Sequence, residues 1–169
     1  MCTTLITLAL CREGTARPHT EYTVGSEPPP ETSPDWINTL FDKIYAAYND
    51  RDAGATADCY TESMEILVNG EPGPADRAGF IEALGEQWNG FPDVNAAEVH
   101  RLVRGDQVIT EMIIEGHNAA EFLGRRATGK LWRVAVAWVC RVADGRVASL
   151  RVYVDNTPLQ AAVRVGERL

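Results

Sequence analysis

The hydrophobic period of the chain changes near residue 91, and this change limits the possible folds more than any other feature. Upstream, apolar residues recur every three or four positions, which is typical of amphipathic helices, at about 35–49 and 75–89. A short Ala-rich helix is expected at 53–60 and a short strand at 64–68. Downstream, alternation of apolar and polar residues predicts strands at 94–103, 107–118, 131–142 and 146–154. We therefore expect an α+β fold in which three N-terminal helices pack on a strongly curved antiparallel sheet.

Residues 1–34 differ in composition from the rest of the chain. The stretch 3–10 alternates in polarity and is expected to form an arm that adds a strand to a sheet edge or to a partner subunit. No Lys or Arg precedes it, so it does not match a secretory signal. Residues 12–34 contain five prolines together with Gly and Ser, which is typical of an extended linker. We expect an arm and Pro-rich linker at 1–34 and one domain at 35–169.

Charge and cysteine patterns exclude several classes of function. The chain has 24 acidic and 16 basic residues, a net charge of −8, which disfavours binding to nucleic acid or to an anionic membrane. No apolar run approaches the roughly 20 residues that a membrane span needs. The four cysteines form no CxxC motif or Cys/His cluster, so we expect no metal site and reduced thiols in a cytoplasmic protein. The remaining partner is a small molecule, bound without a cofactor.

A strongly curved sheet packed on helices encloses a cavity, and strand register predicts which side chains enter it. On the strand 107–118, the more apolar face contains Thr110, Met112, Ile114, Gly116 and Asn118. On the strand 131–142, the corresponding face contains Trp132, Val134, Val136, Trp138 and Cys140. We therefore expect an apolar cavity with Met112, Trp132 and Trp138 as walls that contact substrate. For the two tryptophans the alternative is packing alone.

Three aromatic residues of the helical half are further candidates for substrate contact. Tyr45 and Tyr48 lie on the apolar stripe of the first expected helix, and Trp88 ends the third. Each fits core packing, with the tyrosine hydroxyls bonded to a neighbour. Each also fits a ligand contact, by a hydroxyl that reaches into the cavity or by stacking at its mouth.

The strand 94–103 contains a candidate acid/base pair. Strict alternation places Glu98 and His100 on one face, together with Val94 and Ala96. A neighbouring carboxylate orients an imidazole and favours its charged form, and His is the usual general acid or base near neutral pH. The alternative is that this face is exposed and both side chains are solvated.

The strand region also contains five short motifs. They are GFPDV at 90–94, GDQV at 105–108, GHNAAEFLGRRATGK at 116–130, DGRV at 144–147 and YVD at 153–155. Together they resemble the SnoaL-like polyketide cyclases over about residues 35–162. This resemblance implies an NTF2-like cone, the fold that these cyclases share with ketosteroid isomerase and limonene epoxide hydrolase.

The resemblance also indicates which positions carry chemistry in the relatives. The cavity His of SnoaL-like cyclases corresponds to Asn118, and their acid/base Asp corresponds to Trp132, so the usual pair is replaced. His117 is expected to point away from the cavity. Asn118 is expected to donate to a ligand carbonyl or enolate, with a turn residue bonded to its own backbone as the alternative. By comparison with limonene epoxide hydrolase, Asn69 matches a water-holding asparagine, whereas Val152 replaces a catalytic Asp.

These features and the resemblance predict a cofactor-independent cyclase or isomerase of secondary metabolism. It is expected to act by acid/base catalysis, in an enclosed pocket, on an apolar, oxygenated natural-product intermediate of the polyketide type. The predicted catalytic residues are His100, Glu98 and Asn118. One alternative is a non-catalytic ligand-binding or dimerisation module, and another is an epoxide-opening enzyme with a rearranged acid pair that includes Glu98. We expect a homodimer, because relatives commonly pair through the outer face of the sheet.

Overall fold

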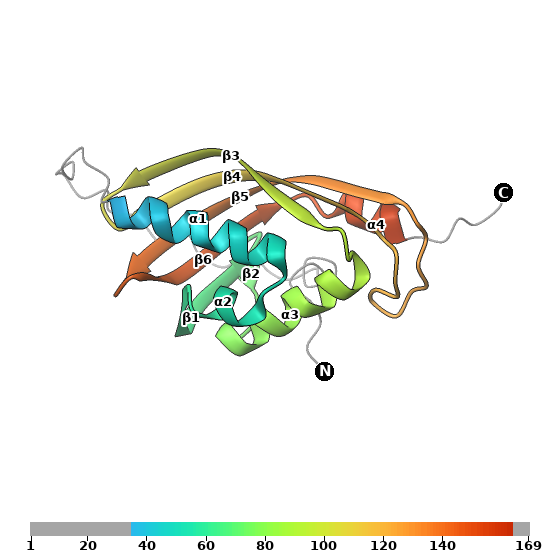
Figure 1. The fold of residues 1–169 in the computed structure, drawn as a ribbon, viewed down its shortest axis with the longest axis horizontal. Coiled ribbons are helices and arrows are strands. Elements are labelled where there is room, and N and C mark those ends of the chain that lie inside the picture. The colour runs from blue at the N-terminus through green and yellow to red at the C-terminus, as the bar shows by residue number, and fades with distance from the viewer. Residues whose placement is uncertain (1–34, 164–169) are drawn as a thin grey trace, which may run out of the picture.

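The computed structural model describes residues 35–163 (Figure 1). The expected arm and linker at 1–34, and the end of the expected domain at 164–169, lie outside the described residues. The helices are α1 (Asp35–Asp50), α2 (Ala53–Ala57), α3 (Arg77–Gly90) and α4 (Thr157–Val163). The strands are β1 (Tyr60–Val68), β2 (Glu71–Pro72), β3 (Asn95–Arg104), β4 (Gln107–His117), β5 (Leu131–Ala143) and β6 (Arg146–Val154).

The strands form one sheet in the order β2-β1-β6-β5-β4-β3. Neighbouring strands are antiparallel except β1 and β6, which run parallel. The sheet arches over α1, α2 and α3, while α4 contacts β5 (Figure 1). The predicted α+β class, with three N-terminal helices on a curved sheet, is confirmed. A parallel pair is possible here because β1 and β6 are far apart in the chain and are not joined by a hairpin, which would force them to be antiparallel.

The junction between α2 and β1 differs from the sequence prediction. Helix α2 ends at Ala57 rather than at 60, and β1 begins at Tyr60 rather than at 64. Long-range pairing causes the difference, since the Val147 amide donates to the Cys59 carbonyl (N···O 2.9 Å) and Tyr60 pairs with Val147. Sheet formation thus overrides the local helix propensity of this segment.

The predicted inner faces of α1, β4 and β5 are confirmed by their burial. The α1 stripe around Phe41 and Ile44 is buried, although Trp36, which continues the stripe into the first turn, remains 45% exposed. Burial alternates residue by residue along β4 and β5, with Met112 and Val136 inside. The period-two pattern therefore predicted the correct register for both central strands.

Strand β3 contains a β-bulge that reverses its faces part-way along. Glu98 pairs with Met112 of β4, and His100 pairs with Glu111, so Val99 is the unpaired extra residue. Because Met112 points into the interior, Glu98 lies on the inner side of the sheet. Because Glu111 points outward, His100 lies on the outer side, and it is exposed. The prediction that Glu98 and His100 share one face is therefore wrong.

The bulge places a different residue on the inner side. Arg101 pairs with Thr110, which is fully buried, so its guanidinium group points back over the interior toward α1. Only 10% of the Arg101 side chain is exposed. Arg101 therefore occupies the inner position that strict alternation assigns to His100.

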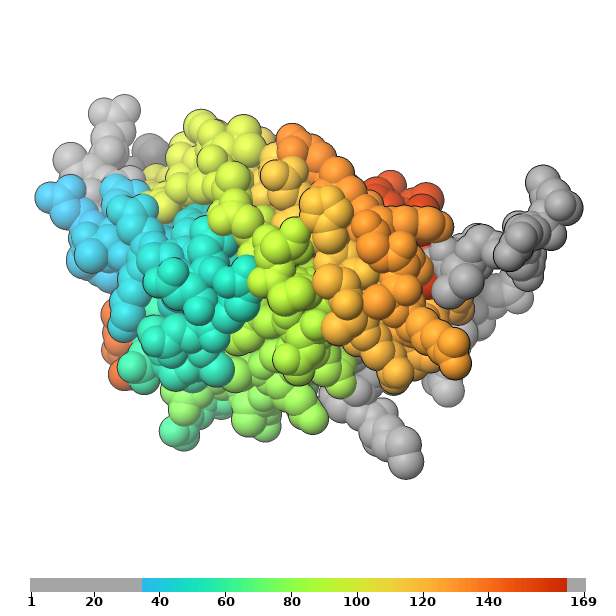
Figure 2. Space-filling model, turned by 45° about the vertical axis from the view of Figure 1, so that its right-hand side comes forward, coloured from blue at the N-terminus to red at the C-terminus, as the bar shows by residue number. Residues whose placement is uncertain are grey.

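The connection 118–130 between β4 and β5 folds back over the C-terminal end of α3. The Gly90 carbonyl accepts hydrogen bonds from two amides of this connection, at N···O distances of 3.1 and 3.3 Å. The rings of Phe91 and Phe122 lie edge-on with centroids 5.2 Å apart. Figure 2 shows α3 and this connection as adjacent parts of one surface. A Cβ added at Gly90 would lie 2.7–2.9 Å from Phe122, so this contact requires glycine.

We expect Gly90→Ala to lower the free energy of unfolding by about 1–3 kcal/mol, because the Phe122 ring cannot retreat without moving the connection. Gly85→Ala is the matched control in the same helix, since nothing lies within 4 Å of its added Cβ. That control is expected to raise stability by about 0.5–1 kcal/mol through helix propensity. Urea denaturation followed by circular dichroism measures both, and equal stabilisation by the two changes would contradict the close contact.

Candidate functional site

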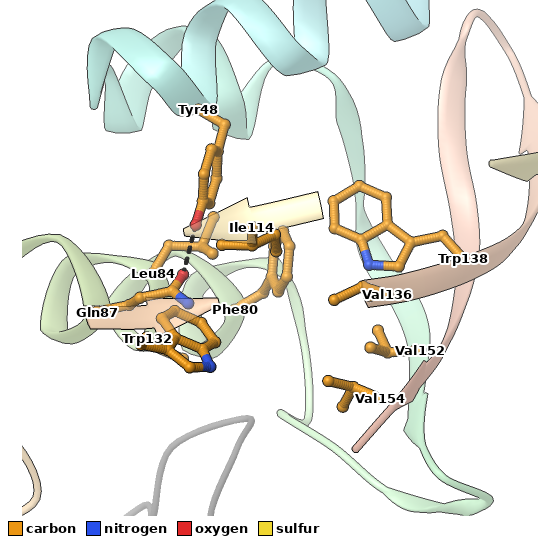
Figure 3. Close-up of a pocket in the computed structure, with 11 residues that line it drawn as sticks. Tyr48, Phe80, Leu84, Gln87, Ile114, Trp132, Val136, Trp138, Val152 and Val154 are labelled. Atoms are coloured by element: carbon orange, nitrogen blue, oxygen red, sulfur yellow. Dashed lines mark hydrogen bonds between the residues drawn. The ribbon is translucent and has the colours of Figure 1, made fainter. Parts of the chain in front are cut away.

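A pocket lies between the inner face of the sheet and helices α1 and α3 (Figure 3). Its empty volume is about 570 Å³, part of which is open solvent at its mouth. It is lined by Tyr48, Phe80, Ala83, Leu84, Gln87, Ile114, Trp132, Val136, Trp138, Val152 and Val154. None of these side chains carries a charge, and most are aliphatic or aromatic. A ligand that fits this pocket is therefore largely apolar.

One hydrogen-bonded pair supplies an amide and a hydroxyl to this apolar pocket. The Tyr48 hydroxyl donates to Oε1 of Gln87 (O···O 2.9 Å), and both side chains are buried (Figure 3). Burial raises the pKa of Tyr48 well above its usual value, so the hydroxyl stays protonated at physiological pH. Within residues 35–163, the Gln87 amide nitrogen has no hydrogen-bond partner. This nitrogen is therefore free to donate to a ligand.

Three of the seven predicted substrate-binding residues line the pocket, namely Tyr48, Trp132 and Trp138. Trp132 is almost fully buried, and its ring packs against Phe91 with centroids 5.1 Å apart. Its indole nitrogen has no hydrogen-bond partner in the described part of the chain. Trp132 and Trp138 lie on opposite sides of the pocket, as Figure 3 shows.

Tyr45, Trp88 and Met112 are buried but do not line the pocket. The Tyr45 hydroxyl is hydrogen-bonded to Oγ1 of Thr110 (2.6 Å), and burial raises the pKa of Tyr45 to about 12. Trp88 lies edge-on to Tyr48, with ring centroids 5.9 Å apart, and so packs against that tyrosine from outside the pocket. For Tyr45 and Trp88 this is the packing alternative, whereas the predicted substrate contact of Met112 is not formed, because its side chain is enclosed in the core.

Asn69 is exposed and lies away from the pocket. It adopts a left-handed backbone conformation (φ +51°) just after β1. Its side-chain amide both donates to the Val154 carbonyl (2.9 Å) and accepts from the Val154 amide (3.0 Å). The predicted substrate contact of Asn69 is therefore not formed, because its amide extends the pairing of β1 with β6.

Asn118 is fully buried, and its amide is already hydrogen-bonded within the protein. Its nitrogen donates to the carbonyls of Ala120 (3.0 Å) and Gly90 (3.4 Å). Its oxygen accepts from the backbone amide and from the hydroxyl of Thr128, at 2.9 and 3.1 Å. The predicted donation by Asn118 to a ligand therefore lacks a free donor, and Asn118 instead holds the connection 118–130 in place.

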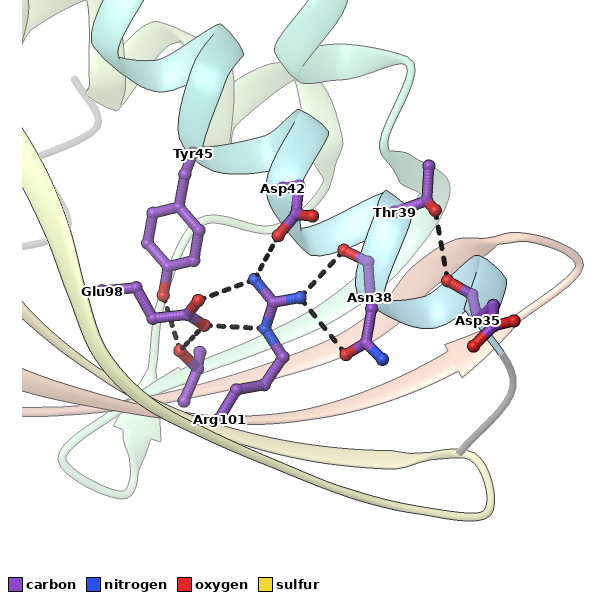
Figure 4. Close-up of polar contacts among 8 residues, drawn as sticks. Asp35, Asn38, Thr39, Asp42, Tyr45, Glu98 and Arg101 are labelled. Atoms are coloured by element: carbon purple, nitrogen blue, oxygen red, sulfur yellow. Dashed lines mark hydrogen bonds and ion pairs between the residues drawn. The ribbon is translucent and has the colours of Figure 1, made fainter. Parts of the chain in front are cut away.

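The predicted catalytic residues Glu98 and His100 also lie outside the pocket. Glu98 forms a two-point ion pair with Arg101, with N···O distances of 2.8 and 2.7 Å. It also accepts a hydrogen bond from Thr110 (2.8 Å), which in turn contacts Tyr45 (Figure 4). Both Glu98 oxygens are thus occupied, and the bulge turns His100 to the other side of the sheet.

Arg101 connects this polar cluster to α1. Its guanidinium group donates to Asp42 (2.8 Å) and to the Asn38 carbonyl (2.8 Å), as Figure 4 shows. It also lies over the Phe41 ring, 5.5 Å from the ring centroid. Burial alone would lower the pKa of Arg101, but the hydrogen bonds to Glu98 and Asp42 outweigh it and raise the pKa. The group therefore stays charged and fastens α1 to the edge of the sheet.

The expectation that His117 points away from the cavity is confirmed. His117 is 55% exposed and its Nδ1 lies 2.7 Å from Asp93 Oδ2. Hydrogen bonds from the His117 side chain and backbone lower the pKa of Asp93. Among the described residues, no group of three or more His, Cys, Asp or Glu side chains is placed to hold a metal ion. Nor is any helix there long and apolar enough to cross a membrane.

Gln87 is the polar pocket residue that sequence reasoning missed. Its signal was available, because Phe80, Leu84 and Gln87 recur at spacings of four and three residues on the buried side of α3. A polar residue at such a position is expected either to bond within the core or to serve a site. Here it does both, with its oxygen bonded to Tyr48 and its nitrogen toward the pocket.

The fold and pocket define an α+β cone with an apolar pocket that opens to solvent at its mouth. Residues 38–163 match the family model of the SnoaL-like polyketide cyclases, which is most of the chain, and the protein belongs to this family. The expected NTF2-like cone is thereby confirmed. No curated protein matches the chain.

Solved structures show the same fold at low sequence identity. A proposed SnoaL-like polyketide cyclase from Jannaschia sp. CCS1 has a TM-score of 0.71 and 18% identity, covering 82% of this chain and 99% of its own. AclR from Streptomyces galilaeus, a proposed hydroxylase, has a TM-score of 0.68 and 17% identity, and the match covers 75% of this chain and 93% of AclR. IdmH from Streptomyces antibioticus, a proposed polyketide cyclase, has a TM-score of 0.65 and 24% identity, and the match covers 76% of this chain and 98% of IdmH. At these identities the likeness establishes the fold alone.

We expect Arg101→Met to lower the free energy of unfolding by about 2–4 kcal/mol, because it leaves the Glu98 carboxylate without its charge partner and detaches α1 from β3. Arg104→Met, at the exposed end of the same strand, is the matched control and is expected to change stability by less than about 0.5 kcal/mol. Thermal unfolding of both variants measures the difference. Similar stability of the two would show that the Arg101 cluster does not join helix to sheet.

Proposed function

We propose that this protein is a cofactor-independent cyclase or isomerase for an apolar, oxygenated intermediate of the polyketide type. The observation that carries the proposal is the pocket itself, where the Tyr48–Gln87 pair adds directed polarity to an otherwise apolar lining. Membership in the SnoaL-like polyketide cyclase family supports the same reaction class. We also propose a cytoplasmic setting, with which the unpaired, buried thiols of Cys59 and Cys140 are compatible.

In this proposal the pocket acts by confinement and hydrogen bonding. The apolar walls hold a flexible chain in a folded conformation, which brings its reacting carbons together. The Gln87 amide donates to a substrate carbonyl and stabilises the negative charge that develops on its oxygen during ring closure. The Tyr48 hydroxyl holds the amide in position through the 2.9 Å hydrogen bond. In this ring closure an enol carbon of the substrate forms the new bond to the carbonyl carbon, the C=O π bond breaks, and the enol proton passes within the substrate to the new alkoxide. No second reactant is required, and loss of the resulting hydroxyl as water gives the lighter product.

A second candidate function is ligand binding without turnover. The observation that favours it is the absence of any carboxylate or imidazole among the residues that line the pocket. NTF2-like domains serve as carriers as well as enzymes, and the fold does not decide between these roles. Binding and product formation therefore have to be measured separately.

The test uses a panel of linear polyketide-type esters, with binding followed by tryptophan fluorescence and product by liquid chromatography and mass spectrometry. The enzyme proposal expects a cyclised product of unchanged mass or of a mass lower by one water. We expect Ala83→Leu, which fills the pocket, to reduce kcat/KM at least roughly tenfold. Glu82→Leu, on the exposed side of the same helix, is the control and is expected to leave kcat/KM unchanged. Binding without product from any ester would favour the carrier.

We also propose that two copies of the chain pair through the outer face of the sheet. Support comes from large apolar side chains that are exposed on this face, namely Leu102, Ile109, Leu131 and Tyr153. Leu102 and Ile109 are directly paired across β3 and β4, so they form a continuous apolar patch. A patch of this kind on one side of a sheet is typical of an interface.

The homodimer proposal predicts a mass in solution of twice the 18.5 kDa of the chain. Ile109→Glu places an unpaired charge in the patch and is expected to give the monomer mass. Ala46→Glu, at an exposed position of α1, adds the same charge elsewhere and is expected to leave the dimer intact. Light scattering after size exclusion measures all three proteins, and a monomeric unmodified protein would contradict the proposal.

A further inference from the structure

The two end strands of the sheet are covered to different degrees. At one end, β2 pairs with the last two residues of β1. Along the rest of that edge, the Gly73 amide donates to the Ile66 carbonyl (2.9 Å) and Arg77 donates to the Tyr60 carbonyl (3.3 Å). The exposed carboxylate of Glu62 also lies on this strand and opposes the approach of an apolar segment. The β1 edge is therefore already capped by the chain itself.

At the other end of the sheet, β3 is covered only along its first half. The Asn49 side chain of α1 donates to the Ala96 carbonyl (3.0 Å) and accepts from the Ala96 amide (2.7 Å), so its amide takes the place of a neighbouring strand. Beyond the bulge, no strand of the described chain lies beside residues 99–104 (Figure 1). The side chains of Val99 and Leu102 there are 64% and 54% exposed. An end strand with exposed apolar side chains is a template for one further strand.

The segment 3–10, TTLITLAL, has the composition that this edge of β3 requires. It contains no charged residue, and its β-branched and aliphatic side chains suit a strand. In an extended strand, alternation would put Ile6, Leu8 and Leu10 on one face and Leu5, Thr7 and Ala9 on the other. The first set matches the outer side of the sheet, where Leu102 and Ile109 form an apolar patch. The smaller and more polar second set matches the inner side, where Arg101 and its partners lie.

The segment 3–10 can reach β3 within the same chain. Arg101 of β3 donates to the carbonyl of Asn38, close to the start of α1, so the chain enters the described part beside this strand. Residues 11–34 connect the two, and even a flexible coil of that length spans roughly 27 Å. A six-residue strand such as 99–104 is about 20 Å long. Docking on β3 therefore requires no second copy of the chain.

We infer that residues 3–10 dock on the edge of β3 in their own chain as an added strand along residues 99–104. Main-chain hydrogen bonds would hold the added strand, and the patch that contains Leu102 would receive its apolar face. An uncharged apolar run of this kind is prone to aggregation when it stays uncovered, and docking would cover it. Docking would not depend on the proposed reaction, so an inactive protein would leave it unaffected.

Disulfide trapping tests this docking, because the native Cys2 and Cys11 flank the segment 3–10. The other two thiols, Cys59 and Cys140, are buried and should not compete. The full chain is oxidised mildly, and the products are identified by mass spectrometry of non-reduced peptides. Thermal unfolding checks that each variant is folded.

Val99→Cys and Arg104→Cys place a thiol at either end of the proposed docking edge. Ser63→Cys, at an exposed position of β1, is the matched control on the opposite edge of the sheet. We expect disulfides to Cys2 or Cys11 to form at least roughly tenfold faster at 99 or 104 than at 63, because docking raises the local concentration of the arm thiols. These disulfides should lie within one chain.

Charge changes and hydrogen exchange provide a second measurement. Leu8→Glu puts a charge on the apolar face and is expected to lower the trapping rate to that of the control. Thr15→Glu adds the same charge outside the segment 3–10 and is expected to leave the rate unchanged. Removal of residues 2–12 is expected to speed amide exchange in 99–104 and not in 61–65.

Three results would overturn the inference. The first is equal trapping at positions 99, 104 and 63. The second is trapping that joins two chains at twice the chain mass, which would assign the edge to the arm of a partner subunit. The third is amide exchange in 99–104 that is unchanged by removal of residues 2–12.

Discussion

The burial of one guanidinium group, that of Arg101, constrains how the helices and the edge of the sheet fit together. The β-bulge at Val99 turns this group inward, where it needs hydrogen-bond acceptors from more than one element. Glu98 supplies two oxygens from the same strand, and α1 supplies Asp42 and the Asn38 carbonyl. These contacts fix α1 against β3, and the buried apolar stripe of α1 fixes the helix against the other strands. The same helix also forms one side of the pocket, because α1 carries Tyr48.

The two tyrosines of α1 show how one helix serves two separate polar sites. Tyr45 and Tyr48 are three residues apart, so both face the interior about one turn from each other. Tyr45 ends the chain of hydrogen bonds that runs through Thr110 to Glu98 and Arg101, and its hydroxyl is occupied there. Tyr48 donates to Gln87 at the pocket. Any shift of α1 along the sheet would disturb both hydrogen bonds together, so the Arg101 cluster also positions the pocket amide.

Several features of this arrangement could be predicted from the sequence, and the others depend on contacts that no local pattern contains. Alternation along β4 and β5 was sufficient to place Met112 and Trp138 inside, because one buried face fixes the register of a strand. The bulge at Val99 was not predictable, since one extra residue leaves a plausible alternation on either side of it. The environments of Asn118 and Asn69 depend on carbonyls and amides far away in the chain, such as those of Gly90 and Val154. Their hydrogen bonds therefore only became evident from the fold.

The position that corresponds to the cavity His of SnoaL-like relatives is structural here, and this bears on how such a pocket can work. Asn118 holds the connection between β4 and β5, and Trp132, at the position of the relatives' Asp, forms part of the wall. Because no carboxylate or imidazole lines the pocket and Tyr48 stays protonated, the pocket offers no side chain that takes up a proton. It can still accelerate a reaction whose partners are already activated within the substrate, by holding them in contact and by polarising one carbonyl. Membership in a cyclase family is therefore compatible with an uncharged pocket on two conditions. The substrate must itself carry the activated groups that react, and the shape and hydrogen-bond donors of the pocket must select which substrate binds.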